Sequence, residues 1–433
     1  MIMTQNPITY PVVAQDVFGY LAGKYTSNNQ LACVLKLNGL IEKEILKSVI
    51  ALSIKEQPIL GHHLVETDKG LQWVQIENVK DGDVFSFFET LNTEELIQQF
   101  IIQPFDINND LQVKIGLFRN ESDTLVVKIN HACADAGGLK QYIQLLVSIY
   151  NQLFHGQSYE IQRPLCRDRS QQKILLAPDR KQLESLMFHH CELLPTVSFP
   201  GQRGDNDQQA IIIKQLPEKL LKSIIRYAHR SRATVNDLLL TAYIRALATT
   251  CRLEEDNTVT VNMTVDLRRY LPANSTDTIS NISGGEIIAL IVEEDDTFHQ
   301  TFKKVVRITR GLKRNYPGLL SAFRLERLGS VTWKEANESF QRQYQAGLET
   351  NQCIPCLSNV GIISDKPLVL GNIQVKNDFL VGPALYSPGL ILFASTYNRT
   401  LTITFNYYQS SISKALAEQF IQAITSELHQ AIV

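Results

Sequence analysis

The sequence predicts an α/β protein built from two domains of similar size. The chain has 433 residues, which as a loose guide corresponds to two or three domains. Strand-like and helix-like periods alternate along it, which is typical of layered α/β folds. A polar, irregular stretch separates two halves with similar ingredients. We therefore expect a first domain at residues 1–165, a linker at 166–180, a second domain at 181–433 and a cleft between the domains.

The first half begins with a strand at residues 30–37 and an amphipathic helix at 42–56. A strand pair follows at 63–66 and 71–76. A helix at 93–102 has Asn92 as its expected N-cap. Residues 111–118 and 124–130 alternate around a polar turn and predict a hairpin. An amphipathic helix at 139–154 closes the domain.

The second half repeats this alternation. A strand is expected at 210–216, followed by a helix at 217–231. Thr234 and Asp237 have the capping-box spacing in front of an apolar helix that ends near residue 248. A strand at 258–265, a hairpin at 390–396 and 400–407, and a helix at 411–432 complete the prediction.

The composition excludes several classes of protein. Hydrophobic residues make up 44% and charged residues 20%, enough to fill a large core. Lys and Arg number 42 against 44 Asp and Glu, so the basic surplus of a nucleic-acid binder is missing. The sequence has no apolar run of about 18 residues and no secretion-type start. We therefore expect a cytoplasmic protein without a membrane span.

The cysteines predict no disulfide scaffold. Seven in a chain of this length are too sparse. Cys353 and Cys356 have metal or redox spacing, but a second pair is missing and a strand follows them. We expect buried or incidental thiols and no metal site.

The candidate chemistry lies at His131 and Asp135, between a strand end and a helix, with Gly137 and Gly138 behind them. A neutral imidazole can take a proton from a hydroxyl or amine. The carboxylate could orient the ring, or it could point away and anchor the loop through an arginine. The spacing alone fits equally a packed histidine beside an ordinary capping aspartate.

This stretch resembles the signature of the condensation-domain and CoA-dependent acyltransferase superfamily, His-His-x-x-x-Asp-Gly at a strand end before a helix. His131 matches the second His of the signature and Asp135 matches its Asp. Asn130 replaces the first His, and Ala136 replaces the Gly. Some branches of the superfamily keep only the second His.

Further segments resemble family blocks in the family's order, over residues 9–432. They are residues 57–60 (QPIL, with Gly61 where Arg is usual), 104–111 (PFDINNDL), 233–240 (ATVNDLLL), 265–272 (VDLRRYLP) with 279–281 (ISN), 357–361 (LSNVG) and the closing hairpin and helix.

The resemblance implies two chloramphenicol acetyltransferase-like lobes that form a V, each a mixed sheet with flanking helices. It implies a tunnel between them with His131 at its midpoint. A thioester donor, on CoA or on a carrier protein's phosphopantetheine arm, enters from one side. An alcohol or amine acceptor enters from the other. No permanent cofactor is implied.

The resemblance also implies roles for residues. His131 is the general base, and Asp135 is structural, with Arg268 as our chosen partner. Asn130, Gly137 and Gly138 support the site. The candidates for oxyanion or substrate binding are the N–H groups of Gly137 and Gly138 and the side chains of Ser358, Asn359 and Asn281.

We therefore predict an acyltransferase that forms an ester or an amide. Any carrier protein must bind in trans, and the near-neutral net charge favours CoA modestly. Two alternatives remain open. One is a condensation-type amide synthase that acts on carrier-bound substrates. The other is a non-catalytic binding protein that retains the fold, which the departures at Asn130, Gly61 and Ala136 support.

Overall fold

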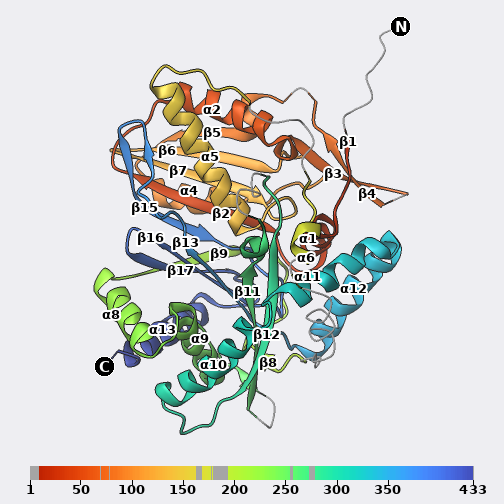
Figure 1. The fold of residues 1–433 in the computed structure, drawn as a ribbon, viewed down its shortest axis with the longest axis vertical. Helices are drawn as coiled ribbons and strands as arrows, with labels where there is room; N and C mark the ends of the chain where they lie inside the picture. Colours follow the sequence, from red (N-terminus) through yellow and green to blue (C-terminus); the bar gives the residue numbers. More distant parts are fainter. Residues whose placement is uncertain are drawn as a thin grey trace.

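The computed structural model describes residues 9–68, 70–77, 79–161, 168–176, 178, 194–253, 257–272 and 278–432. Two six-stranded sheets, each with its own hydrophobic core, form two lobes that pack on each other (Figure 1). The predicted α/β class is confirmed. A helix long and apolar enough to cross a membrane is not found in these ranges.

The first sheet has the order β14-β15-β2-β7-β6-β5, and all its neighbouring strands are antiparallel except β5 and β6. Its strands are β2 (Gln30–Leu37), β5 (Phe85–Glu89), β6 (Val113–Arg119), β7 (Asp123–Asn130), β14 (Val369–Leu370) and β15 (Ile373–Val381). The central strand β7 is buried along its whole length. Helices α2 (Lys43–Glu56) and α5 (Ala136–Phe154) cover one face (Figure 1). The predicted helices and hairpin are thus confirmed.

A small sheet with the order β1-β4-β3 and three further helices complete this lobe. They are β1 (Thr9–Tyr10), β3 (His62–Thr67), β4 (Gly70–Gln75), α1 (Ala14–Tyr25), α3 (Asp81–Val84) and α4 (Thr93–Ile102), with a 3₁₀ turn at Pro58–Gly61. Asn92 is the N-cap residue of α4, but its side chain donates to Glu95 at 2.7 Å instead of accepting from the helix.

The second sheet has the order β12-β11-β13-β16-β17-β9. Its strands are β9 (Gln209–Leu216), β11 (Thr258–Asp266), β12 (Ser283–Ile291), β13 (Cys356–Ile362), β16 (Ile391–Tyr397) and β17 (Thr400–Tyr408). Helices α8 (Glu218–Arg230), α9 (Val235–Thr250), α10 (Phe298–Lys313) and α13 (Lys414–Gln430) cover one face (Figure 1). The predicted capping box is confirmed, since Thr234 and Asp237 bond reciprocally at the start of α9.

The sequence patterns assigned no element between residues 283 and 350, where the structure has β12, α10, α11 (Leu319–Glu326) and α12 (Trp333–Thr350). Short elements lie at α6 (Gln172–Leu175), β8 (Val197–Ser198) and β10 (Arg252–Leu253), with 3₁₀ turns at Leu267–Tyr270 and Arg327–Ser330.

Strands β14 and β15 connect the two halves of the sequence. They belong to the segment 181–433, yet β15 pairs with β2 and extends the first sheet. Without β15, the apolar strand β2 would be an open sheet edge, which favours its being covered. The first sheet therefore contains strands from both halves of the sequence, whereas all six strands of the second sheet come from residues 209–408.

The predicted linker at residues 166–180 contains a buried residue. Residues 168–176 and 178 of it are described, and the other positions of 166–180 lie outside the described residues. Gln171 is buried and donates to the Ala322 carbonyl of α11 at 3.0 Å. At Gln171 the described part of this segment therefore packs against α11.

Candidate active site

His131 directly follows β7, at the end of the first sheet. Its N–H donates to the Asn29 carbonyl at 2.8 Å. The side-chain oxygen of Asn130 accepts the Ala132 N–H at 2.9 Å and an Asn29 amide proton at 3.3 Å. Asn130 thus fixes the turn that leaves the strand, and this contact is made by the residue that replaces the first histidine of the signature.

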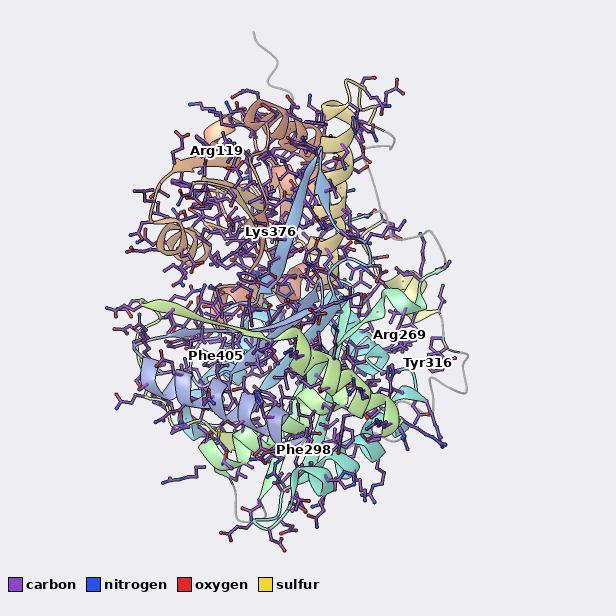
Figure 2. All side chains as sticks on the ribbon, turned by 90° about the vertical axis from the view of Figure 1, so that its left-hand side faces the viewer. Arg119, Arg269, Phe298, Tyr316, Lys376 and Phe405 are labelled. Carbon is purple, nitrogen blue, oxygen red and sulfur yellow. The ribbon has the colours of Figure 1, made fainter. Side chains whose placement is uncertain are left out.

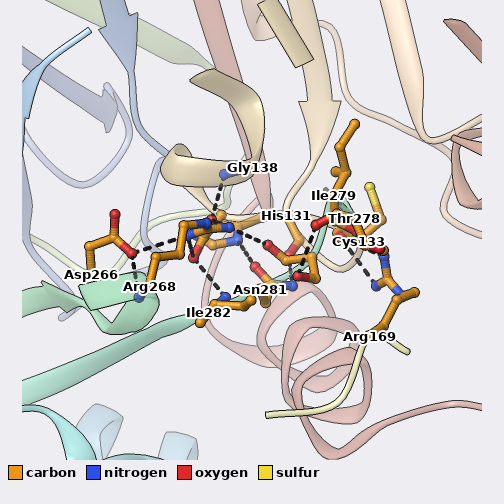
Figure 3. Close-up of polar contacts among 12 residues, drawn as sticks. His131, Cys133, Gly138, Arg169, Asp266, Arg268, Thr278, Ile279, Asn281 and Ile282 are labelled. Carbon is orange, nitrogen blue, oxygen red and sulfur yellow. Dashed lines mark hydrogen bonds and ion pairs between the residues drawn. The ribbon is translucent and has the colours of Figure 1, made fainter. Parts of the chain in front are cut away.

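The imidazole of His131 contacts Asn281, which comes from the second lobe. The Asn281 amide nitrogen donates to the carbonyls of His131 and Ala132 at 2.8 and 3.1 Å (Figure 3). Its oxygen therefore faces the ring and lies 3.2 Å from Nδ1. Because an amide oxygen only accepts, this contact selects the neutral tautomer that carries its proton on Nδ1 and its lone pair on Nε2.

Asp135 is held by four contacts. Arg268 binds both of its oxygens, at 2.8 and 3.0 Å, and the N–H groups of Gly138 and Ile282 donate at 2.7 and 2.8 Å (Figure 3). Burial alone would raise the pKa of Asp135, but Arg268 and these N–H groups hold the pKa below its usual value. Asp135 is the N-cap of α5, and these contacts make it an anchor of the loop.

Arg268 comes from the turn after β11 and is itself almost fully buried. It also donates to the Ser280 carbonyl at 3.0 Å and contacts Asp266 at 3.3 Å. A Cβ atom on Gly137 would lie 2.3 Å from its Nη1 atom. Gly137 therefore has no side chain because the guanidinium occupies that space.

Arg169 is a further support that the sequence did not predict. From the predicted linker it donates to the carbonyls of Cys133 and Ile279, at 3.1 and 2.6 Å (Figure 3). It also pairs with buried Asp16 of α1 at 2.6 Å. It joins the loop of His131 to the segment that carries Asn281. The polar run at 167–173 concealed this role, since a buried arginine with its partners far along the chain has no local signature.

Two cavities border the end of β7. His131 lines one of about 120 Å³, together with Gly137, Lys140, Thr264, Ser358 and Asn359. Asn130 lines the other, of about 580 Å³, together with Asn29, Phe105, Gln209, Tyr386 and Tyr408. Both cavities have walls from both lobes, and neighbouring residues at one strand end border different spaces.

The predicted oxyanion candidates do not all have free donors. The Gly138 N–H already donates to Asp135. Asn359 donates to Asn236 at 3.2 Å and accepts from the Gly361 N–H. Ser358 accepts from the Thr264 hydroxyl at 3.1 Å, which leaves its own proton available. The Gly137 N–H lies in the first turn of α5, where N–H groups have no intrahelical acceptor.

Lys140 is a second cavity residue that the sequence did not single out. It donates to the Val360 carbonyl at 2.9 Å, so it links α5 to β13. Burial lowers its pKa.

The cysteines near these residues are inert thiols. Burial raises the pKa values of Cys133, Cys353 and Cys356 to about 12, so all three are neutral at pH 7. Cys133 donates to the Asn130 carbonyl at 3.2 Å rather than to His131. This geometry argues against a Cys–His nucleophile.

Comparison with known protein families identifies the family of this chain. Residues 18–314 match the family described as Condensation domain. The chain belongs to the condensation-domain family. A search of curated proteins finds no match.

Solved condensation-type structures share this fold over their whole length. The first condensation domain of the calcium-dependent antibiotic synthetase has a TM-score of 0.70 at 12% identity and covers 99% of this chain and 98% of its own. TRI3 trichothecene 15-O-acetyltransferase from Fusarium sporotrichioides has a TM-score of 0.70 at 11% identity, with 99% and 96% covered. The starter condensation domain of rhizomide synthetase RzmA, bound to C8-CoA, has a TM-score of 0.68 at 16% identity, with 98% and 95% covered.

The predicted family and the two-lobe, chloramphenicol acetyltransferase-like fold are thus confirmed. Family and neighbours together support a transferase that carries out condensation or acyl transfer. The fold alone does not set the reaction, because an epimerization domain of tyrocidine synthetase has a similar structure, with a TM-score of 0.66 at 15% identity over 99% of this chain and 98% of its own.

Proposed function

We propose that this condensation-family protein transfers an acyl group from a thioester to an alcohol or amine, with Nε2 of His131 as the general base. The observation that carries the proposal is the contact between Asn281 and Nδ1, which leaves Nε2 unprotonated on a residue that lines a cavity between the lobes. A tunnel through this site, reached from both sides, remains part of the proposal.

In the proposed reaction, Nε2 takes the proton of the acceptor as its oxygen or nitrogen attacks the thioester carbonyl. The new C–O or C–N bond forms and a tetrahedral oxyanion results. The C–S bond then breaks, and His131 returns the proton to the leaving thiolate. The proposed route needs no acyl-enzyme, because binding both reactants side by side at His131 orients them for direct transfer.

The oxyanion is assigned to the donors that remain available. The Gly137 N–H lies at the positive end of α5, and Ser358 has a free hydroxyl proton, and both line the cavity of His131. Gly138 supports the loop, since its N–H donates to Asp135, and Asn359 supports β13 through its contacts with Asn236 and Gly361. Asp135 and Arg268 hold the loop and do not take part in proton transfer.

The donor is acyl-CoA or an acylated phosphopantetheine arm, and the reaction takes place in the cytoplasm. The complex of RzmA with C8-CoA supports a thioester donor, and the O-acetyltransferase TRI3 supports a hydroxyl acceptor. Amine acceptors, as in a condensation-type amide synthase, remain within the proposal.

The test compares His131→Ala with the wild type and with His155→Ala, an exposed histidine at the end of α5. Each is assayed with acyl-CoA and acyl-carrier donors and a panel of alcohols and amines, with products identified by mass spectrometry. We expect kcat to fall about 10²–10⁴-fold for His131→Ala, with unchanged thermal stability and an active control. Equal turnover by wild type and His131→Ala would remove the base. No turnover by the wild type with any thioester would favour a binding protein.

A further inference from the structure

Lys140 brings a positive charge to the cavity of His131 that the proposed reaction does not use. Its side chain comes from the second turn of α5 and lines that cavity from the first lobe, while Asp266 of β11 lines it from the second. Figure 2 shows the two lobes one above the other, with Lys376 of β15 in the upper lobe and Phe405 of β17 in the lower. Because the cavity has a volume of only about 120 Å³, a substrate bound beside His131 also lies close to Lys140.

Nζ of Lys140 has two hydrogen-bond acceptors in the described part of the chain. It donates to the carbonyls of Val360 and Ile362 at 2.9 and 3.3 Å. Both acceptors are neutral, and an ammonium carries three protons. One proton is therefore available to a molecule in the cavity.

The charge of Lys140 has no carboxylate partner among the residues that the structure describes. The two carboxylates that line the same cavity, Asp135 and Asp266, both bind Arg268 instead. Burial lowers the pKa of Lys140, and the more distant charges of these carboxylates do not offset this effect. A half-buried cation of this kind costs stability unless an anion pairs with it.

Lys128 shows how this protein holds another lysine without a counter-ion. It is fully buried in β7 and donates to the carbonyls of Phe100 and Gln103 at the end of α4. Its ammonium also lies 5.2 and 5.0 Å from the ring centroids of Phe100 and Phe105, which stabilise a cation. Lys140 shares the pair of carbonyl contacts, but it faces a cavity, and within the described ranges no aromatic ring lies over its ammonium. Its charge is therefore left for a ligand.

We propose that Lys140 binds a carboxylate carried by one of the two substrates, so that the reaction at His131 selects a carboxylated substrate. The proposal rests on the proposed function and names a substrate class for it. One available ammonium proton suits a singly charged carboxylate, whereas a phosphate carries up to two charges and has three oxygens to satisfy. The carboxylate belongs either to the acyl group, as in the half-thioester of a dicarboxylic acid, or to the acceptor, as in a hydroxy acid or an amino acid.

The test compares Lys140→Gln, which removes the charge and keeps an N–H donor, with Lys140→Arg, which keeps the charge. The matched control is Lys334→Gln at an exposed position on α12, where the change in net charge is the same. In one arm, succinyl-CoA is compared with butyryl-CoA, which has the same chain length, on neutral acceptors. In the other arm, butyryl-CoA is supplied with glycine or glycinamide and with lactate or methyl lactate.

The quantity measured is the ratio of kcat/KM for the charged member of each pair to kcat/KM for the neutral member. Both values come from one preparation, so a loss of folded protein cancels. We expect Lys140→Gln to lower this ratio about tenfold or more in one arm, mainly through KM, since a hydrogen bond between charged groups is lost. Lys140→Arg should keep most of the ratio, and Lys334→Gln should keep all of it. The arm that responds identifies the substrate that carries the carboxylate.

Equal ratios for the wild type and Lys140→Gln in both arms would overturn the proposal and leave the general base in place. Calorimetry on His131→Ala, with Lys140 kept or changed to Gln, measures binding of the same pairs without turnover. Tighter binding of the charged member that depends on Lys140, with no turnover of any thioester by the wild type, would support the carboxylate site and contradict the proposed function instead. Equal binding of charged and neutral members would overturn the carboxylate site.

Discussion

His131 and Asp135, four residues apart in one loop, both contact the segment that follows β11, yet in opposite ways. Asp135 meets a charged partner and two N–H groups, and its two oxygens are fully used. His131 meets one neutral amide oxygen through Nδ1 only, which in the neutral ring puts the lone pair on Nε2. All acceptor positions at the Asp135 end of the loop are therefore used. At the His131 end, one ring nitrogen remains available.

The difference separates the stability of the site from its chemistry. A buried charge needs its partner, so the ion pair of Asp135 and Arg268 fixes the loop to the second lobe. A general base needs an unoccupied lone pair and a defined tautomer, which a single hydrogen bond supplies. Changes at the two ends should therefore have different readouts.

The largest effect on stability is expected at the ion pair of Asp135 and Arg268. Arg268→Met leaves the Asp135 carboxylate buried and unpaired, and we expect a loss of about 3–5 kcal/mol in the free energy of unfolding together with a loss of activity. Chemical denaturation measures the loss.

The double variant Asp135→Asn with Arg268→Met serves as its control. It removes the charge along with its partner, so it should recover part of the lost stability. A single Arg268→Met variant as stable as the wild type, or a double variant less stable than the single, would show that the pair is not the anchor.

A smaller effect is expected at His131, where a change should alter the reaction rate and not the stability of the fold. Asn281→Ala removes the contact to Nδ1, and we expect kcat to fall about tenfold, the equivalent of about 1.4 kcal/mol, with KM little changed. Asn281→Asp keeps an acceptor for Nδ1 but adds a negative charge that favours the imidazolium, so the acidic limb of the pH–rate profile should move to higher pH. A structural role alone would not move that profile, and an unshifted limb would count against positioning of the base.

The smallest effect is expected in acid. The pKa of Asp135 is lower in the folded chain than its usual value of 3.8. Between these two values the unfolded chain binds more protons, so the stabilisation is complete above about pH 4 and is lost as the pH falls through the folded pKa. The wild type should therefore lose stability below about pH 4 more steeply than the double variant, by up to about 1.4 kcal/mol per pH unit. Parallel curves from acid denaturation series would contradict this assignment.

The local elements were predictable because their signals are local. The strand at β2 and the helix at α4 are found where periodicity placed them, and the capping box marked the start of α9. Strand β15 was not assigned to the first sheet, because a period of two residues indicates a strand but not which neighbour it pairs with.

Sequence by itself determined the fold class, most helices and strands, and the presence of a histidine and an aspartate four residues apart at a strand end, since hydrophobic periodicity and short motifs depend only on neighbouring residues. Tertiary structure decided which nitrogen of His131 is free, that Arg169 is a buried support, and that Lys140 contacts β13 beside the cavity of His131. Each of these depends on groups tens to more than a hundred residues apart that only tertiary packing brings together.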